Sequence, residues 1–195
     1  MNDEIGQGGA DAAQEAREAL EAVGEMTART KRAMWTGGGD FLFIVWGAVW
    51  IIGYSMFQFF PKPANTVWNV LLGCGILASV IIFWRMNARV KGAVPGRLIL
   101  FWILLSIYAA IWLYLLKPYS GRQVGTFIPI VVMFAYVVMG LWGSEPLLLW
   151  IGLLVTALIL VGYIFAGAWM ALWLAVFGGG TLFATGLYIR LAWRS

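Results

Sequence analysis

Six long apolar runs follow residue 40 of this chain, and short polar or proline-containing segments separate most of them. The runs cover residues 41–60, 66–84, 98–116, 124–143, 146–166 and 168–189. Each is close to the ~20 residues that an α-helix needs to cross a hydrocarbon core ~30 Å thick. The pattern predicts an all-α integral membrane protein, a six-transmembrane-helix bundle over residues 41–195 that we expect to be built from three helical hairpins.

The separation between the last two runs is the weakest. Ala166, Gly167 and Ala168 stand where a polar turn would be expected. A single helix over residues 146–189 would be ~66 Å long, about twice the thickness of the hydrocarbon core, so two spans fit better than one. At the start of the first run, we expect the carboxylate of Asp40 to cap the helix.

The segment before the first run differs from the rest of the chain. Residues 1–10 are polar and rich in glycine, so we expect a disordered tail. Residues 11–36 carry acids early and bases late, which predicts an amphipathic cytoplasmic helix, and residues 37–40 form a glycine linker to the membrane domain. The less polar side of this helix is formed by Ala13, Ala16, Leu20, Val23, Thr27, Thr30 and Met34. This side either packs on the membrane surface or the protein's own inner face, or it binds a partner helix along residues 11–35.

The composition places the chain outside the range of water-soluble domains. Of the 195 residues, 62% are hydrophobic and 11% charged, and the mean hydropathy is +0.85. Soluble domains have roughly 25% charged residues. The single Cys74 rules out an intrachain disulfide, and since histidine is absent there is no Cys/His metal site and no imidazole base. We therefore expect no catalytic residue, no metal site and no cofactor, and a protein that is not an enzyme.

The distribution of charge predicts the orientation in the membrane. Residues 1–35 hold seven of the nine acids and four of the thirteen bases, and the remaining bases are scattered at the ends of the apolar runs. This scatter argues against a nucleic-acid partner in spite of a pI near 9.4. Ten bases fall on one side of the predicted membrane, while Lys62, Lys117 and Arg122 fall on the other. Because cytoplasmic loops carry an excess of Lys and Arg, we expect both termini to be cytoplasmic.

Four of the cytoplasmic bases lie close together in the chain, around the turn between the second and third runs. They are Arg85, Arg89, Lys91 and Arg97. A base near a membrane surface gains ~1 kcal/mol from anionic headgroups. We expect these residues to contact anionic lipids of the bilayer.

The predicted spans carry Asp, Glu, Lys and Arg only near their ends, which argues against a proton-driven or ion-coupled transporter. Their other polar side chains most often form hydrogen bonds between helices. Tyr54, Asn69 and Tyr163 accompany glycines that recur along the chain, and they are the candidates for lining a cavity for a neutral solute. Pro129 lies inside the fourth run, where its missing N–H frees a carbonyl around Gly125.

Two of the runs share the spacing W-x4-G-x-G-x9-R. The matching residues are Trp68, Gly73, Gly75 and Arg85 in the second run, and Trp173, Gly178, Gly180 and Arg190 in the sixth. A Gly-Tyr pair precedes each in the run before, which suggests a parallel duplication of one hairpin; the alternative is a chance match within the small alphabet of membrane helices. The four glycines of this spacing are candidates for close helix packing, within the bundle or in a homo-oligomer.

The stretch from Phe127 to Trp142, together with that from Phe177 to Arg190, resembles small multi-span bacterial membrane proteins of unassigned function, over about residues 40–192. The resemblance implies a bacterial inner membrane and supplies no activity. The leading hypothesis is a structural or regulatory membrane subunit without a catalytic site, whose cytoplasmic helix contacts a partner. The alternative is a small transporter or channel for a neutral or lipophilic solute.

Overall fold

The computed structural model of this chain describes residues 14–15, 17–26, 38–89, 96–117, 119–143 and 145–194. The predicted tail over residues 1–10 and much of the predicted segment 11–36 lie outside the described residues. The described part is helical, without a strand. Six of its helices are long and apolar enough to cross a membrane, which confirms the predicted number of spans.

The six spans follow the predicted apolar runs closely. The first five are α2 (Asp40–Phe59), α3 (Pro61–Arg89), α4 (Gly96–Leu115), α5 (Gly121–Trp142) and α6 (Pro146–Phe165). The sixth consists of η2 (Gly167–Trp169), α7 (Met170–Trp173), the π-helical η3 (Leu174–Gly179) and α8 (Gly180–Arg194). The division of residues 146–189 into two spans is thus correct, and Gly167 makes the turn between them with φ +52°, a conformation that glycine adopts without strain.

Two details at helix starts differ from the prediction. The N-cap position of α2 falls on Gly39 and has no side-chain cap, so the prediction that Asp40 caps this helix is wrong. Asp40 instead lies in the first turn, where the helix dipole favours an acid, and its side chain is buried. α3 begins at Pro61, directly after Phe60 and earlier than expected. Prolines are tolerated in a first helical turn, because the N–H groups there have no partner within the helix.

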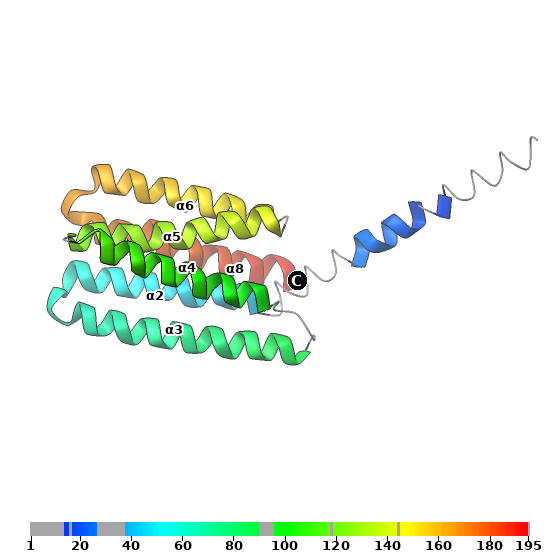
Figure 1. Ribbon diagram of the computed structural model, residues 1–195, viewed down its shortest axis with the longest axis horizontal. Helices are drawn as coiled ribbons and strands as arrows, with labels where there is room; N and C mark the ends of the chain where they lie inside the picture. The colour runs from blue at the N-terminus through cyan, green and yellow to red at the C-terminus, as the bar shows by residue number, and fades with distance from the viewer. Residues whose placement is uncertain are drawn as a thin grey trace, which may run out of the picture.

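α2 lies between α3 and the other spans in the view of Figure 1, and it packs along α3 and along η3 and α8. α5 and α6 form the other extensively packed pair, whereas α4 contacts α5 over only a few residues. In the apolar stretches of α3 and α4 only 6% of the residues are buried, against 39% in α2. The bundle therefore has a compact core of four spans, and α3 and α4 lie at its periphery.

Glycines bring the backbones of the core spans into direct contact. A Cβ atom added to Gly47, Gly179 or Gly186 would lie 2.5 to 2.8 Å from a backbone or side-chain atom across the α2–α8 and α2–η3 contacts. Between α5 and α6, a Cβ added to Gly140 would lie 2.5 Å from the backbone nitrogen of Leu149. Close approach of this kind commonly drives helix association in membranes. Lipid tails are as apolar as the side chains, so helices gain little from the hydrophobic effect and associate through van der Waals packing instead.

Candidate functional site

Tyr54, one of the three residues predicted to line a solute cavity, is packed tightly by its neighbours. The residue lies in α2 and is only 4% exposed. Its ring centroid lies 6.0 Å from that of Trp50 and 5.0 Å from that of Trp68. Its hydroxyl donates a hydrogen bond of 3.0 Å to the carbonyl oxygen of Gly125 in α5. Tyr54 therefore links α2, α3 and α5.

Asn69 and Tyr163 lie elsewhere on the bundle. The side chain of Asn69 is exposed on the periphery of α3. Tyr163 is 39% exposed on α6, and its ring lies 4.8 Å from the guanidinium carbon of Arg122. Neither the groove between α4 and α5 nor the hollow beside Phe59 and Pro63 is lined by Tyr54, Asn69 or Tyr163. The three side chains lie in different surroundings, and a cavity for a neutral solute at them stays a prediction.

The predicted packing glycines have mixed outcomes. A Cβ at Gly178 would lie 3.1 Å from the ring of Trp50, and one at Gly75 would make ordinary contact with Trp46 and Val49. Gly73 has no atom within 4 Å of an added Cβ, and Gly180 meets only the carbonyl of Ala175 at 4.0 Å. Among the described residues, Gly73 and Gly180 therefore make no close contact between spans, and a contact in a homo-oligomer stays a prediction. Both glycines face away from the neighbouring spans, a direction that the shared spacing did not reveal.

Several glycines that do make backbone contact were not among the four predicted, including Gly47, Gly140 and Gly186. A signal existed for one of them: Gly179 and Gly186 are seven residues apart, which places them on the same side of a helix, two turns from each other. Gly47 stands alone in α2 and has no such partner in the sequence. Its close contact with Phe183 depends on the position of α8 in the bundle.

The tryptophans of the shared spacing make the same contact in both places. Trp68 lies against Gly53 and Trp173 lies against Gly162, the glycines of the two Gly-Tyr pairs. In each case a Cβ added to the glycine would overlap the indole ring. The ring nitrogen of Trp173 also donates a hydrogen bond of 2.8 Å to the carbonyl oxygen of Leu158. Both copies of the shared spacing therefore place a tryptophan against a glycine of the preceding span.

The four bases predicted to contact anionic lipid are only partly described. Arg85 is exposed near the end of α3, and Arg97 is exposed at the beginning of α4. Lys91 and the side chain of Arg89 lie outside the described residues. Exposure near the end of a span is what a headgroup contact requires, and the contact itself stays a prediction.

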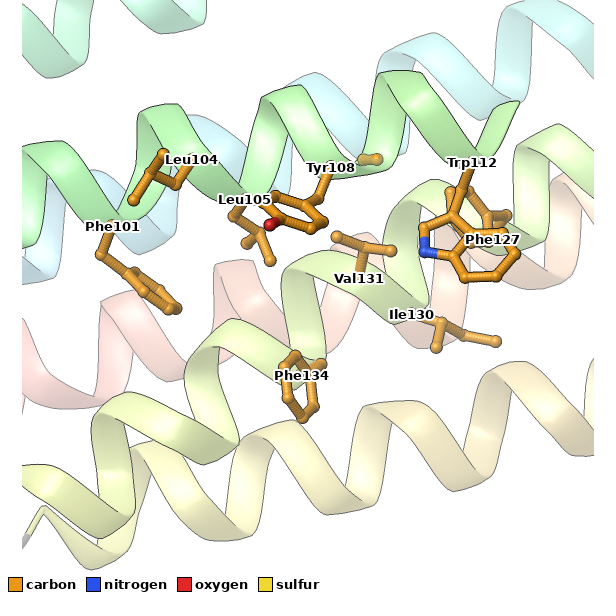
Figure 2. Close-up of a pocket in the computed structure, with 10 residues that line it drawn as sticks. Phe101, Leu104, Leu105, Tyr108, Trp112, Phe127, Ile130, Val131 and Phe134 are labelled. Carbon is orange, nitrogen blue, oxygen red and sulfur yellow. The ribbon is translucent and has the colours of Figure 1, made fainter. Parts of the chain in front are cut away.

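One apolar groove opens between the peripheral α4 and its neighbour α5 (Figure 2). Its volume is ≈ 530 Å³. The walls consist of large apolar and aromatic side chains and one alanine: Phe101, Leu104, Leu105, Tyr108, Ala109, Trp112, Phe127, Ile130, Val131 and Phe134. Ala109 is the buried residue of α4 and lines the groove. Because its side chain is a single methyl group, it leaves a gap that a larger side chain would fill. No sequence signal marked this groove, because α4 is apolar on all sides.

The N-terminal helix contributes a second exposed apolar surface. The described residues from 14 to 26 are helical and exposed throughout, and in Figure 1 this helix lies apart from the bundle. Leu20, Val23 and Met26 are 72%, 62% and 70% exposed. At 100° per residue these three side chains fall within an arc of ~120° and form one face. The described residues of this helix make no buried contact with the bundle, whereas contact with the protein's own inner face is one of the arrangements expected for its less polar side.

Within the described part of the chain, no group of three or more Asp, Glu, Cys or His side chains is arranged to hold a metal ion. Comparisons with protein-family models, with curated proteins and with solved structures found no match to this chain. Function therefore has to be argued from the two apolar surfaces and from the packing of the bundle.

Proposed function

We propose that this chain is a membrane subunit without a catalytic site, structural or regulatory in role, whose N-terminal helix binds a partner protein. The observation that carries the proposal is the exposed face of Leu20, Val23 and Met26. Soluble surfaces rarely hold large apolar side chains together unless another surface covers them. An amphipathic helix of this kind binds a groove or a second helix through side chains spaced three or four residues apart.

The membrane domain supports the same proposal. Its core is filled by side chains and by glycine contacts between backbones, and the ionisable residues of the spans lie near their ends. A bundle of this kind is suited to a fixed position in the membrane, from which the helix reaches its partner. An ion-coupled transporter would need a polar path with ionisable groups at mid-membrane.

The finer description of the subunit is also part of the proposal. The distribution of Lys and Arg supports cytoplasmic N- and C-termini, and the resemblance supports a bacterial inner membrane. The repeated tryptophan-to-glycine contact supports three helical hairpins, of which the first and third arose by duplication.

Substitution of the exposed apolar face tests the proposed function. The variant Leu20→Ser, Val23→Ser and Met26→Ser removes the large side chains, and the control Glu18→Ser, Glu21→Ser and Glu25→Ser changes the opposite side of the same helix. Membranes that contain the intact chain are treated with a cross-linker and solubilised, and the chain is purified. We expect one stoichiometric partner with the intact chain and the control, and its loss with the apolar-face variant. Equal loss in both variants, or no partner with the intact chain, would contradict the proposal.

A further inference from the structure

We propose that the groove between α4 and α5 binds one acyl chain of an anionic phospholipid, whose phosphate lies near Lys117 and Arg122. The groove is a feature separate from the N-terminal helix, so this proposal does not depend on the proposed function. It rests on the shape of the groove, on its place in the membrane and on the charge at one end of the bundle.

The groove belongs to two membrane spans, so its surroundings are lipid. Its walls are almost entirely apolar and its volume is ≈ 530 Å³. Water does not stably fill an apolar cavity, and an empty gap of this size forfeits the contacts of every side chain that lines it. The acyl chains of the bilayer are the apolar groups available to fill it.

The length of the groove matches that of an acyl chain in one leaflet of the bilayer. From Phe101 to Trp112 the groove follows α4 for ~16 Å, about half the thickness of the hydrocarbon core and hence the depth of one leaflet.

The charge at the outer end of the bundle favours an anionic headgroup. Lys117 follows α4, and Arg122 is the second residue of α5, so the two bases flank the connection between the helices that form the groove. Lys62 lies at the same end, in the first turn of α3, and none of the acidic residues that the structure describes lies at this end of the bundle. The Lys117 ammonium lies 5.5 Å from the ring centroid of Tyr114. The Arg122 guanidinium lies 4.8 Å from the ring centroid of Tyr163 and donates a hydrogen bond to the carbonyl oxygen of that residue. A guanidinium has five N–H donors, so this bond leaves others for a phosphate.

Trp112 lies between the apolar and the charged part of the proposed site. It is three residues from the end of α4, at the level where tryptophans gather at membrane interfaces. Its side chain is 53% exposed and lines the groove (Figure 2), and within the described part of the chain its ring N–H has no hydrogen-bond partner. This N–H is placed to donate to an ester carbonyl of the bound lipid.

Two adjacent alanines provide a matched pair of variants. Ala109 lines the groove and Ala110 is exposed outside it. Ala109→Phe fills the groove, and Ala110→Phe adds the same side chain to the lipid-facing surface. The full chain is incubated with phosphatidylglycerol or phosphatidylcholine in detergent and examined by native mass spectrometry. We expect one retained phosphatidylglycerol for the wild type and for Ala110→Phe, and at least tenfold lower occupancy for Ala109→Phe.

A second set of variants separates the headgroup from the chain. Lys117→Gln and Arg122→Gln are expected to reduce the preference for phosphatidylglycerol over phosphatidylcholine about fivefold each, and Lys62→Gln should leave it unchanged. Equal occupancy in Ala109→Phe and Ala110→Phe would overturn the acyl-chain site. Equal effects of all three glutamine variants would overturn the headgroup site, because a diffuse surface charge would then suffice.

Photo-cross-linking of the wild type keeps the test independent of whether the variants fold. The full chain is placed in nanodiscs of phosphatidylglycerol and phosphatidylcholine that include a phospholipid with a diazirine in its acyl chain. We expect labelling to concentrate on Tyr108, Val131 and Phe134 over the exposed Val70, Leu77 and Val80 of α3. Uniform labelling of both helices would overturn the proposal, as would a dimer that is lost in Ala109→Phe, since a second copy would then occupy the groove.

Discussion

The hydroxyl of Tyr54 in α2 donates a hydrogen bond of 3.0 Å to the carbonyl oxygen of Gly125 in α5. In a regular helix this carbonyl would accept from the N–H of residue 129, and that residue is Pro129, which has none. The bond therefore supplies the donor that the proline removes. Backbone groups inside a membrane cannot form hydrogen bonds to water, so the Tyr54 hydroxyl replaces the missing donor for this carbonyl.

The first prediction concerns this pair. Tyr54→Phe removes the hydroxyl and should lower the free energy of unfolding by ~0.6 to 1.7 kcal/mol, the range found for hydrogen bonds between membrane helices. In the background of Pro129→Ala, the N–H of residue 129 returns and the same substitution should cost less. Reversible unfolding in mixed micelles measures the four proteins of this double-mutant cycle. Purely additive effects would mean that Tyr54 and Pro129 are not coupled through Gly125.

The second prediction compares two glycines. Gly47→Ala places a Cβ 2.5 Å from the backbone nitrogen of Phe183, and neither backbone can move without separating α2 from α8. We expect a loss of ~1 to 3 kcal/mol in the free energy of unfolding, as for overpacked cores. The control Gly73→Ala meets no atom within 4 Å and should be neutral or stabilising by up to ~1 kcal/mol, because alanine favours a helix more than glycine does. Equal effects at both positions would argue against the α2–α8 contact.

The third prediction concerns the repeated tryptophan contact. Gly53→Ala and Gly162→Ala each place a methyl group against an indole ring, that of Trp68 or Trp173. Both should lower the thermal midpoint of the detergent-solubilised protein, and a tryptophan fluorescence shift should accompany the change as the ring is displaced. Trp173→Phe should also destabilise the protein by roughly 1 kcal/mol, because the carbonyl of Leu158 loses its additional donor. A response at only one of the two glycines would weaken the case for related hairpins.

The fourth prediction concerns orientation. Cys74 is the only cysteine, so a Cys74→Ser background allows single cysteines to be placed at either end of the bundle. Tyr119→Cys, between α4 and α5, should react with a membrane-impermeant maleimide on intact cells, whereas Ala88→Cys, near the end of α3, should react only after the membrane is opened. The reverse pattern would place the termini outside and contradict the distribution of Lys and Arg.

Some of the local features could be read from the sequence because their cause is local. The carbonyl around Gly125 was expected to lack its helical donor, since proline removes that donor wherever it stands in a helix. That Tyr54 supplies the replacement could not be predicted, because the two residues are joined only by the packing of α2 against α5. The surroundings of Tyr54, Asn69 and Tyr163 could not be predicted for the same reason: all three accompany repeated glycines in the sequence, but they lie in different surroundings in the fold.

The sequence by itself determined the number and approximate positions of the six candidate membrane spans, because about twenty consecutive apolar residues must satisfy their backbone hydrogen bonds within one helix to remain in lipid. Only the tertiary structure decided which side of each helix faces a neighbour. In water, a buried face differs in polarity from an exposed one and leaves a periodic pattern. In a membrane both faces are apolar, so the contact at Gly47, the open side of Gly73 and the groove beside Ala109 depend on the shapes of the helices after they have packed together.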